Sequence, residues 1–273
     1  MTTAARVHSS KEASWYTTSG VPLYEIPKAD GKGTRAPTLA DAKKRGDLLP
    51  RVTTILNLLD KPALNDWKLE QGILAVMTTP QLPGEPMDAF IHRVLHVERI
   101  QDQESSVARD KGTDMHDAMQ KRMSGQEVSP ELLPWIEPAA KAIEARGNYV
   151  TSEKILVGDG YAGRCDLLQE APDCWLLSDY KTSRTMPDPK KGAYHEHRLQ
   201  LASYAAALHK STTLAGMTKP IRTCNVYIST VVQGAFLICD HDPNWQCTYN
   251  QGFKSLVTYW QWLTGYAPKT ITL

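Results

Sequence analysis

The chain has 273 residues, of which 41% are apolar and 22% charged, and its formal net charge is +1. These proportions are ordinary for a globular protein, and the length suffices for one large domain with a substantial core. A charge this close to zero is not by itself a signature of nucleic-acid binding.

Several classes of site and location are disfavoured by the sequence. The five cysteines are scattered without a C-x-x-C pair, which argues against a zinc ribbon and fits reduced thiols. No G-x-x-x-x-G-K-[ST] motif is present, so we expect no bound nucleotide and no ATP-driven motor. No apolar run approaches the length of a membrane span and no hydrophobic signal core is present, so we expect a cytoplasmic protein without a membrane partner.

Residues 1–50 are predicted to form an irregular extension, because glycines and prolines interrupt any periodic pattern. The stretch 28–51 holds seven Lys or Arg against three Asp. This locally basic arm suits a polyanionic partner even though the whole chain is nearly neutral. From residue 51 to residue 273 we expect a single domain.

Regular elements are predicted along this domain from the period of the apolar residues. We expect helices at about 52–60, 62–78, 87–123 (broken), 130–147 and 196–210, with a last helix opening at Pro243. We expect strands at about 152–158, 161–168, 174–182, 222–232 and 234–240, the last two as a hairpin. Strands bracketed by helices predict an α/β fold, with a central mixed β-sheet flanked by helices and a helical N-terminal part.

The segment 160–182 carries the most informative residues. Its two predicted strands are separated by a turn. The first strand carries Asp166, and the second carries Asp179 and Lys181. Side chains alternate along a strand, so Asp179 and Lys181 point to the same face. If the two strands pair as a hairpin, Asp166 lies beside Asp179, and two carboxylates that close favour a cation between them.

A surface hairpin with solvated charges is the alternative interpretation of these three residues. Two features favour a site. Leu176 and Leu177 precede the second aspartate, so the charges end a buried strand. Gly163, three residues before Asp166, permits a bend or a close approach of the backbone.

Two predicted helices add polar side chains. His116 lies on the apolar stripe of the helix around residues 105–123, where it is either a core histidine bonded to a carbonyl or a ligand for Mn²⁺ or Mg²⁺. Gln200 and Tyr204 are four residues apart on one face of the helix 196–210. The loop before this helix is basic and includes Arg184, with Arg198 following in the helix, so it either binds phosphates or is a solvated loop.

Four of these segments, in this order, resemble the PD-(D/E)XK nuclease superfamily, in particular its RecB-like exonuclease branch. They are Gly112-Thr113-Asp114-Met115-His116, Gly163-Arg164-Cys165-Asp166, Asp179-Tyr180-Lys181 and Gln200-Leu201-Ala202-Ser203-Tyr204. The resemblance covers roughly residues 105–240. The segment from Leu49 to Leu56 is also similar to the lead-in of phage-type and mitochondrial genome-maintenance members.

The resemblance implies a restriction-endonuclease-like core and a metal-dependent DNA exonuclease of DNA recombination, repair or phage genome processing. It implies one or two Mg²⁺ or Mn²⁺ ions, held by Asp166, Asp179, His116 and the carbonyl of Tyr180. Lys181 would orient or deprotonate the attacking water or stabilise the transition state, with Asp166 and Asp179 also counted as catalytic. Contacts to DNA are expected from Gln200, Tyr204, Arg184 and Arg198.

The resemblance also bears on partners and on alternatives. The substrate would be DNA ends, single- or double-stranded, in a bacterial or phage-infected cell, with a single-strand annealing protein or a helicase as a partner. The cysteines are not clustered as in the relatives that carry an iron–sulfur cluster, so none is expected. Two alternatives stay open, namely a structure-specific or restriction-type endonuclease on the same core, and a non-catalytic DNA-end binding subunit.

Overall fold

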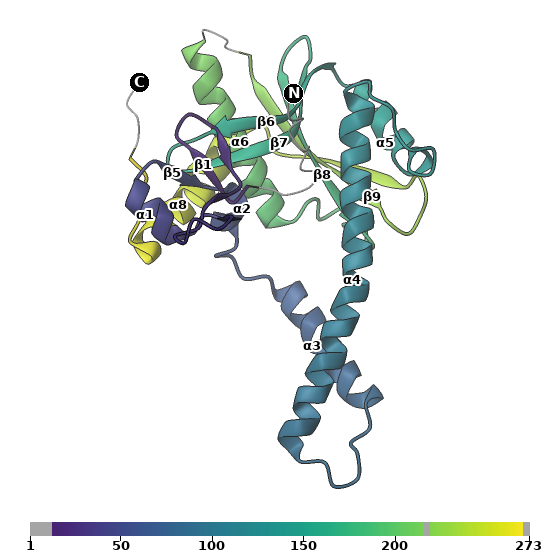
Figure 1. Ribbon diagram of the computed structural model, residues 1–273. Helices are drawn as coiled ribbons and strands as arrows, with labels where there is room; N and C mark the ends of the chain where they lie inside the picture. Colours follow the sequence, from purple (N-terminus) through teal and green to yellow (C-terminus); the bar gives the residue numbers. More distant parts are fainter. Residues whose placement is uncertain (1–12, 216–218, 270–273) are drawn as a thin grey trace, which may run out of the picture. The chain divides into compact units, whose positions relative to one another are not determined.

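The structure is a computed structural model that describes residues 13–215 and 219–269 (Figure 1). The chain divides into two compact units. The larger unit comprises the residues up to Leu58 and those from Met115 onward, and the smaller unit comprises Leu59–Asp114. Each unit is described separately below.

A five-stranded sheet in the order β10-β9-β8-β7-β6 is the centre of the larger unit. Its strands are β6 (Asn148–Val157), β7 (Ala162–Glu170), β8 (Trp175–Ser183), β9 (Ile221–Ser229) and β10 (Phe236–Asp240). Strands β8 and β9 are parallel, whereas every other neighbouring pair in this sheet is antiparallel. The predicted hairpins and the mixed sheet are therefore confirmed.

Helices cover both faces of the sheet. On one face, α5 (Leu133–Glu144) and the last turns of α4 (Met87–Met123) bury a shared apolar core against Leu167, Tyr180 and Val226. The other face receives α6 (His195–Leu214), the long crossover that a parallel β8–β9 pair requires. Because side chains alternate along a strand, Asp179 and Asn225 face α6 while Tyr180 and Val226 face α5. The predicted α/β fold class is confirmed.

Residues 15–50 are more ordered than the sequence predicts. Strand β1 (Trp15–Thr17) pairs with β2 (Pro22–Leu23) and with β5 (Leu48–Pro50), and β3 (Ile26–Pro27) pairs with β4 (Thr34–Arg35). These strands are two or three residues long, too short to produce a periodic pattern in the sequence. Long-range burial of Trp15, Tyr16 and Leu48 holds them in place.

The short helix α1 (Leu39–Arg45) has both terminal signals in its sequence. Thr38 and Asp41 form a reciprocal capping box at its start, and Gly46 ends it in the left-handed conformation with φ of 76°. Lys43, Lys44 and Arg45 occupy its last turn, where positive charge is favourable.

The remaining helices differ from prediction at particular points. Helix α2 is Val52–Leu56, shorter than expected, and α4 is one helix rather than a broken one. The sequence 87–123 contains no proline, and a single glycine costs only about 1 kcal/mol in a helix. The C-terminal part forms α7 (Trp245–Cys247), a π-helical segment (Thr248–Phe253) and α8 (Lys254–Thr264). Within the described ranges, no helix combines the length and apolarity needed to cross a bilayer.

The smaller unit contains α3 (Pro62–Thr78) and most of α4. Its loop is fastened by Arg93, which forms an ion pair with Glu85 at 2.7 Å and donates to the carbonyl of Pro80 at 2.8 Å. Asn65 donates to Asp60 at 2.8 Å near the start of α3.

Candidate active site

Two buried carboxylates meet where strands β7 and β8 separate. The ladder between these strands runs from Glu170↔Trp175 to Leu167↔Ser178, and the next positions along the two strands are Asp166 and Asp179. Beyond the last paired residues, Oδ2 of Asp166 accepts a hydrogen bond from the backbone N–H of Tyr180 at 2.6 Å. The carboxylate thus takes the acceptor position of a ladder carbonyl, and both aspartates are buried.

Lys181 and α6 close one side of this carboxylate pair. Nζ of Lys181 lies 2.5 Å from Oδ2 of Asp179 and donates to Oε1 of Gln200 at 3.1 Å. Nε2 of Gln200 donates in turn to the hydroxyl of Tyr204 at 3.1 Å. Strand alternation puts Asp179 and Lys181 on one face, and helical spacing puts Gln200 and Tyr204 on one face, as the sequence predicts.

His116 closes the opposite side of the pair. Its Nε2 lies 2.9 Å from Oδ2 of Asp166, and its ring packs edge-on against Tyr180 with centroids 5.5 Å apart. Burial lowers the pKa of His116, but the charge of Asp166 and its hydrogen bond outweigh burial, and Asp179 and Glu153 add to them. The pKa is raised to about 9, so the imidazole is protonated at neutral pH.

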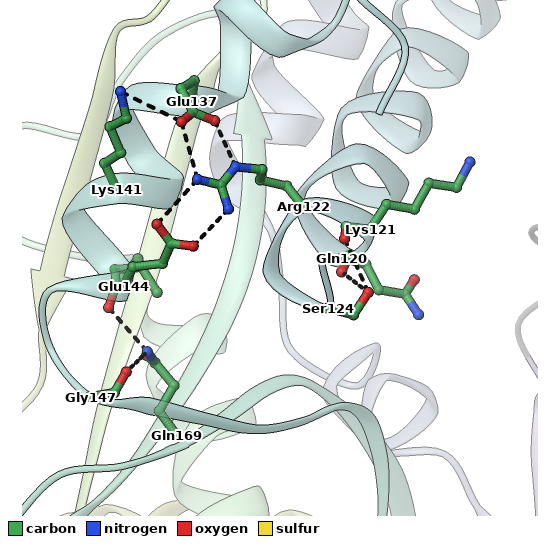
Figure 2. Close-up of polar contacts among 10 residues, drawn as sticks. Gln120, Lys121, Arg122, Ser124, Glu137, Lys141, Glu144, Gly147 and Gln169 are labelled. Carbon is green, nitrogen blue, oxygen red and sulfur yellow. Dashed lines mark hydrogen bonds and ion pairs between the residues drawn. The ribbon is translucent and has the colours of Figure 1, made fainter. Parts of the chain in front are cut away.

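The helix that carries His116 is fixed by both apolar and ionic contacts. Met115, Met119 and Met123 are buried against α5 and the sheet. Figure 2 shows Arg122 between two carboxylates of α5, with Glu137 at 2.8 Å and Glu144 at 2.6 Å. These contacts bind the end of α4 to α5, and so they set the position of His116.

The electrostatics of the two aspartates are unequal. Burial raises the pKa of Asp166, but protonated His116 and Lys181 together with the Tyr180 N–H lower it below its usual range. Burial and the neighbouring Asp166 raise the pKa of Asp179 to about 6, although Lys181 opposes the shift. Two adjacent buried carboxylates disfavour each other's ionisation, and oxygen donors placed in this way suit a divalent cation.

Strand β9 supplies a residue that the sequence analysis missed. Asn225 is fully buried directly beside Asp179 in the parallel register, and its Nδ2 donates to Oδ2 of Asp179 at 3.1 Å. Nε2 of His241 lies 2.8 Å from Oδ1 of Asn225. Burial and Arg198 lower the pKa of His241 to about 4, so it is neutral and donates to this oxygen. His241 thereby fixes the amide with its donor toward Asp179.

These groups line a pocket of about 190 Å³. Seven predicted residues lie around it, namely His116, Asp166, Asp179, Tyr180, Lys181, Gln200 and Tyr204. The structure adds four further side chains, Tyr16, Arg51, Thr53 and Arg164. Arg51 and Thr53 belong to the segment noted for its similarity to phage-type members, and Arg164 belongs to the Gly-Arg-x-Asp motif, so the sequence carried a signal for these three.

Gly163 allows one wall of the pocket to close. A Cβ atom at this position would lie 2.5 Å from Cε1 of Tyr204 and 3.0 Å from Cγ2 of Val52. Only a residue without a side chain therefore lets α6 and α2 approach strand β7 this closely.

Glu153 lies at the edge of this pocket. It is positioned between Ser152 and Lys154, which pair with Leu167 and Cys165, so it stands opposite Asp166. Its φ of 54° is left-handed, the only such value for a non-glycine in the described ranges, and its carboxylate forms an ion pair with Arg164. The Glu153 carboxylate thus holds a pocket arginine in place.

Two predicted DNA contacts lie outside the pocket. Arg184 is exposed beyond the end of β8. Arg198 donates to the carbonyl of Lys191 at 2.9 Å and so fastens the loop before α6. The structure does not bring either side chain to the carboxylate pair.

Comparison with known proteins bears on this arrangement. Residues 139–237 match the family model of the PD-(D/E)XK nuclease superfamily. Among solved structures, SSO0001 is similar at 12% identity and a TM-score of 0.31, over 72% of this chain and 87% of that one. An alkaline exonuclease (LHK-Exo) from Laribacter hongkongensis is similar at 16% identity and a TM-score of 0.31, over 55% of this chain and 77% of that one. No curated protein matches the chain.

The matched segment contains strands β7 and β8, helix α6 and strand β9, and therefore most of the pocket. The match to the PD-(D/E)XK nuclease superfamily confirms, at the level of the superfamily, the resemblance inferred from the four motifs. The match begins after His116, so the assignment of His116 to the site depends on the geometry described above.

Proposed function

We propose that this protein is a metal-dependent DNA exonuclease of the RecB-like branch. The observation that carries the proposal is the convergence of one residue set, distant in sequence, on a single pocket. His116 from α4, Asp166 from β7, Asp179 and Lys181 from β8 and Gln200 from α6 all line it. The motifs that resemble this branch thus meet in space, and the preference for an exonuclease rests on that likeness.

The donor chemistry of the pocket fits a divalent cation. PD-(D/E)XK nucleases generally use divalent metals such as Mg²⁺. Within the described residues no group of three His, Cys, Asp or Glu side chains is already arranged as a metal site. However, two buried carboxylates and an imidazole share the pocket, and burial together with the neighbouring Asp166 raises the pKa of Asp179. Asp166 and Asp179 would hold the ion, and His116 would join them on giving up the proton that it carries at neutral pH in the metal-free protein.

The chain's own groups have separate roles in this proposal. A bound divalent ion would supply charge neutralisation at the scissile phosphate and would acidify the attacking water. Nζ of Lys181, held between Asp179 and Gln200, is positioned to donate to that water or to a phosphate oxygen. Arg51 and Arg164 line the same pocket and suit the flanking phosphates.

End-labelled linear DNA and a covalently closed circle, incubated with Mg²⁺, Mn²⁺ or EDTA, test the proposal. We expect the metal ions to support loss of the linear substrate alone, and the order in which 5′ and 3′ labels are released will give the polarity. The Asp179→Asn variant should be inactive, and Lys190→Ala, which changes an exposed lysine outside the pocket, should act as the wild type.

The other outcomes separate the alternatives. Cutting of the closed circle would replace the exonuclease with an endonuclease on the same core. Binding of DNA ends without cleavage under any metal would contradict the catalytic proposal and favour an end-binding subunit.

A further inference from the structure

Helix α8 presents two aromatic rings outward. Its inner side packs through Val257 and Trp260, and Trp260 lies edge-on to Trp15 at 6.2 Å between ring centroids. Its outer side bears Tyr259 and Trp262, which are 50% and 74% exposed. Their rings are stacked at 5.7 Å with an interplanar angle of 26°. A well-packed helix thus holds a preformed aromatic surface in contact with water.

The core does not require this aromatic pair. The buried side of α8 is already filled, so the two rings contribute little to the packing of the unit. A tryptophan this exposed is unusual, because its ring buries a large apolar area whenever a partner is available. The stacked pair offers a flat π-surface, and Leu263, 55% exposed, extends it.

Positive charge borders the same surface. Residues 254–269 contain two lysines and no Asp or Glu. The basic end of α1 adjoins the carboxyl end of α8, because the Lys269 N–H donates to the carbonyl of Gly46 at 2.9 Å. Nζ of Lys43 lies 3.7 Å from the position that a Cβ atom would take at Gly265, and Figure 1 shows α1 beside α8.

The acidic residues of this region are engaged elsewhere. Asp47 pairs with Arg45 at 2.9 Å, and Asp41 pairs with Arg35 at 2.6 Å. The helix dipole accounts for positive charge in the last turn of α1, but Lys43 and Lys44 are also exposed there and can contact an anion. The border of the aromatic pair is therefore suited to a polyanion.

We propose that Tyr259 and Trp262 are a stacking platform for the bases of single-stranded nucleic acid, with Lys43, Lys44 and Lys269 contacting its phosphates. Aromatic rings beside a basic track are the combination that single-strand binding sites use. A duplex keeps its bases stacked inside, so only a single strand offers faces to these rings. The choice of DNA as the natural strand rests on the proposed function.

The platform belongs to the same unit as the pocket. Helix α8 packs on α2, and Thr53 of α2 lines the pocket. A single strand bound on α8 would therefore be bound by the same unit that carries Asp166 and Asp179.

Fluorescence anisotropy of labelled dT20 in EDTA tests the platform without any cleavage. We expect Trp262→Ala to weaken binding about tenfold, the equivalent of about 1.4 kcal/mol, while Trp262→Phe keeps most of the affinity. Tyr149→Ala removes an exposed aromatic on β6 and is the matched control, which should bind as the wild type does. The double variant Lys43→Gln/Lys44→Gln should lower the slope of log affinity against log salt by about 1.4.

Two results would overturn the platform. One is unchanged dT20 affinity in a folded Trp262→Ala protein, with folding judged by a melting temperature equal to that of the wild type. The other is a self-associated wild type that becomes monomeric in Trp262→Ala at unchanged dT20 affinity, which would make this face a contact between copies. Loss of binding in Trp262→Ala from a protein that cleaves no DNA would support the platform and contradict only the nuclease proposal.

Discussion

Lys181 places Nζ 2.5 Å from Oδ2 of Asp179, two residues earlier on the same strand. The ammonium group is held there by Gln200 as well, so it remains in the pocket rather than extending into solvent. We expect Lys181→Ala to lower cleavage by about 10²–10⁴-fold, because a positioned proton donor or acceptor of this kind contributes that much. Single-turnover cleavage of a labelled linear duplex measures the effect.

Lys181→Ala and Lys190→Ala form a matched pair, since both remove one lysine but only Lys181 lines the pocket. Equal activities for the two variants would contradict the role of Lys181. Circular dichroism of both proteins shows whether the fold is retained.

Asp179 is expected to reduce the stability of the metal-free protein. Its folded pKa, about 6, lies above the ordinary value of 3.8, so ionisation favours the unfolded chain and stability falls as the pH rises through 4 to 6. Asp179→Asn should therefore be as stable as the wild type or about 1–2 kcal/mol more stable at pH 8 in EDTA. Urea unfolding measures this, and marked destabilisation would contradict the assignment.

Metal addition should reverse the order of those two proteins. An ion held by Asp166 and Asp179 stabilises the folded wild type by about 2.7 kcal/mol at a concentration of 100 times Kd. The Asp179→Asn protein should gain much less. Thermal melts with Mn²⁺ against EDTA test this, and an equal gain in both proteins would place the ion elsewhere.

Asn225 should tune the pocket without touching the substrate. Removing its amide in Asn225→Ala leaves Asp179 Oδ2 with one donor fewer, and changes behind a metal ligand typically cost about 10–100-fold in metal affinity or activity. The expected signature is a higher Mn²⁺ requirement for cleavage. An unchanged metal titration would show that Asn225 serves packing alone.

His241 provides a pH signature of its own. The unfolded chain protonates it below about 6.5, whereas the folded chain does so only below about 4. Between these values the unfolded chain carries the extra proton, so the free energy of unfolding falls as the pH is lowered. Allowing for its partial exposure, the loss is on the order of 2 kcal/mol. Asp179 acts in the opposite direction over the same pH range, so the comparison is between wild type and His241→Gln, which keeps a donor for Asn225. Urea titrations at pH 7 and pH 4.5 should show that lowering the pH destabilises the wild type relative to this variant by about this amount.

Gly163→Ala should strain the wall between β7 and α6. The new methyl group would lie 2.5 Å from the ring of Tyr204, and overpacking of this kind costs about 1–3 kcal/mol. The double variant Gly163→Ala/Tyr204→Leu removes the clash. A double-mutant cycle in urea should give a favourable coupling energy, and additive effects would contradict the contact.

The local part of the site could be predicted from the sequence, whereas the long-range part could not. The alternation in 174–182 put Asp179 and Lys181 on one face, and the hairpin put Asp166 next to them. Asn225 lies beside Asp179 only because β9 pairs with β8 in parallel after the α6 crossover, and sequence spacing does not give that register. A buried amide inside the otherwise apolar strand from Cys224 to Ile228 was the available signal.

The N-terminal elements show the same limit. Tyr16 reaches the pocket from β1, a three-residue strand whose partner β5 is some thirty positions away along the chain. Strands this short have no period to detect, so residues 1–50 were predicted to be irregular. Arg184 and Arg198 were chosen from local charge; both lie outside the pocket, and their contact with DNA stays a prediction.

The parallel pairing of β8 with β9 has a consequence for how the protein acquires its chemistry. All of the linear motifs end at Tyr204, before strand β9 begins at Ile221. A nascent chain that has emerged only this far would carry every motif yet lack Asn225, the neighbour of Asp179, and two of the five strands of the sheet. If the pocket is the nuclease site proposed above, hydrolytic competence would arrive only with roughly the last fifth of the chain, after every motif has been synthesised.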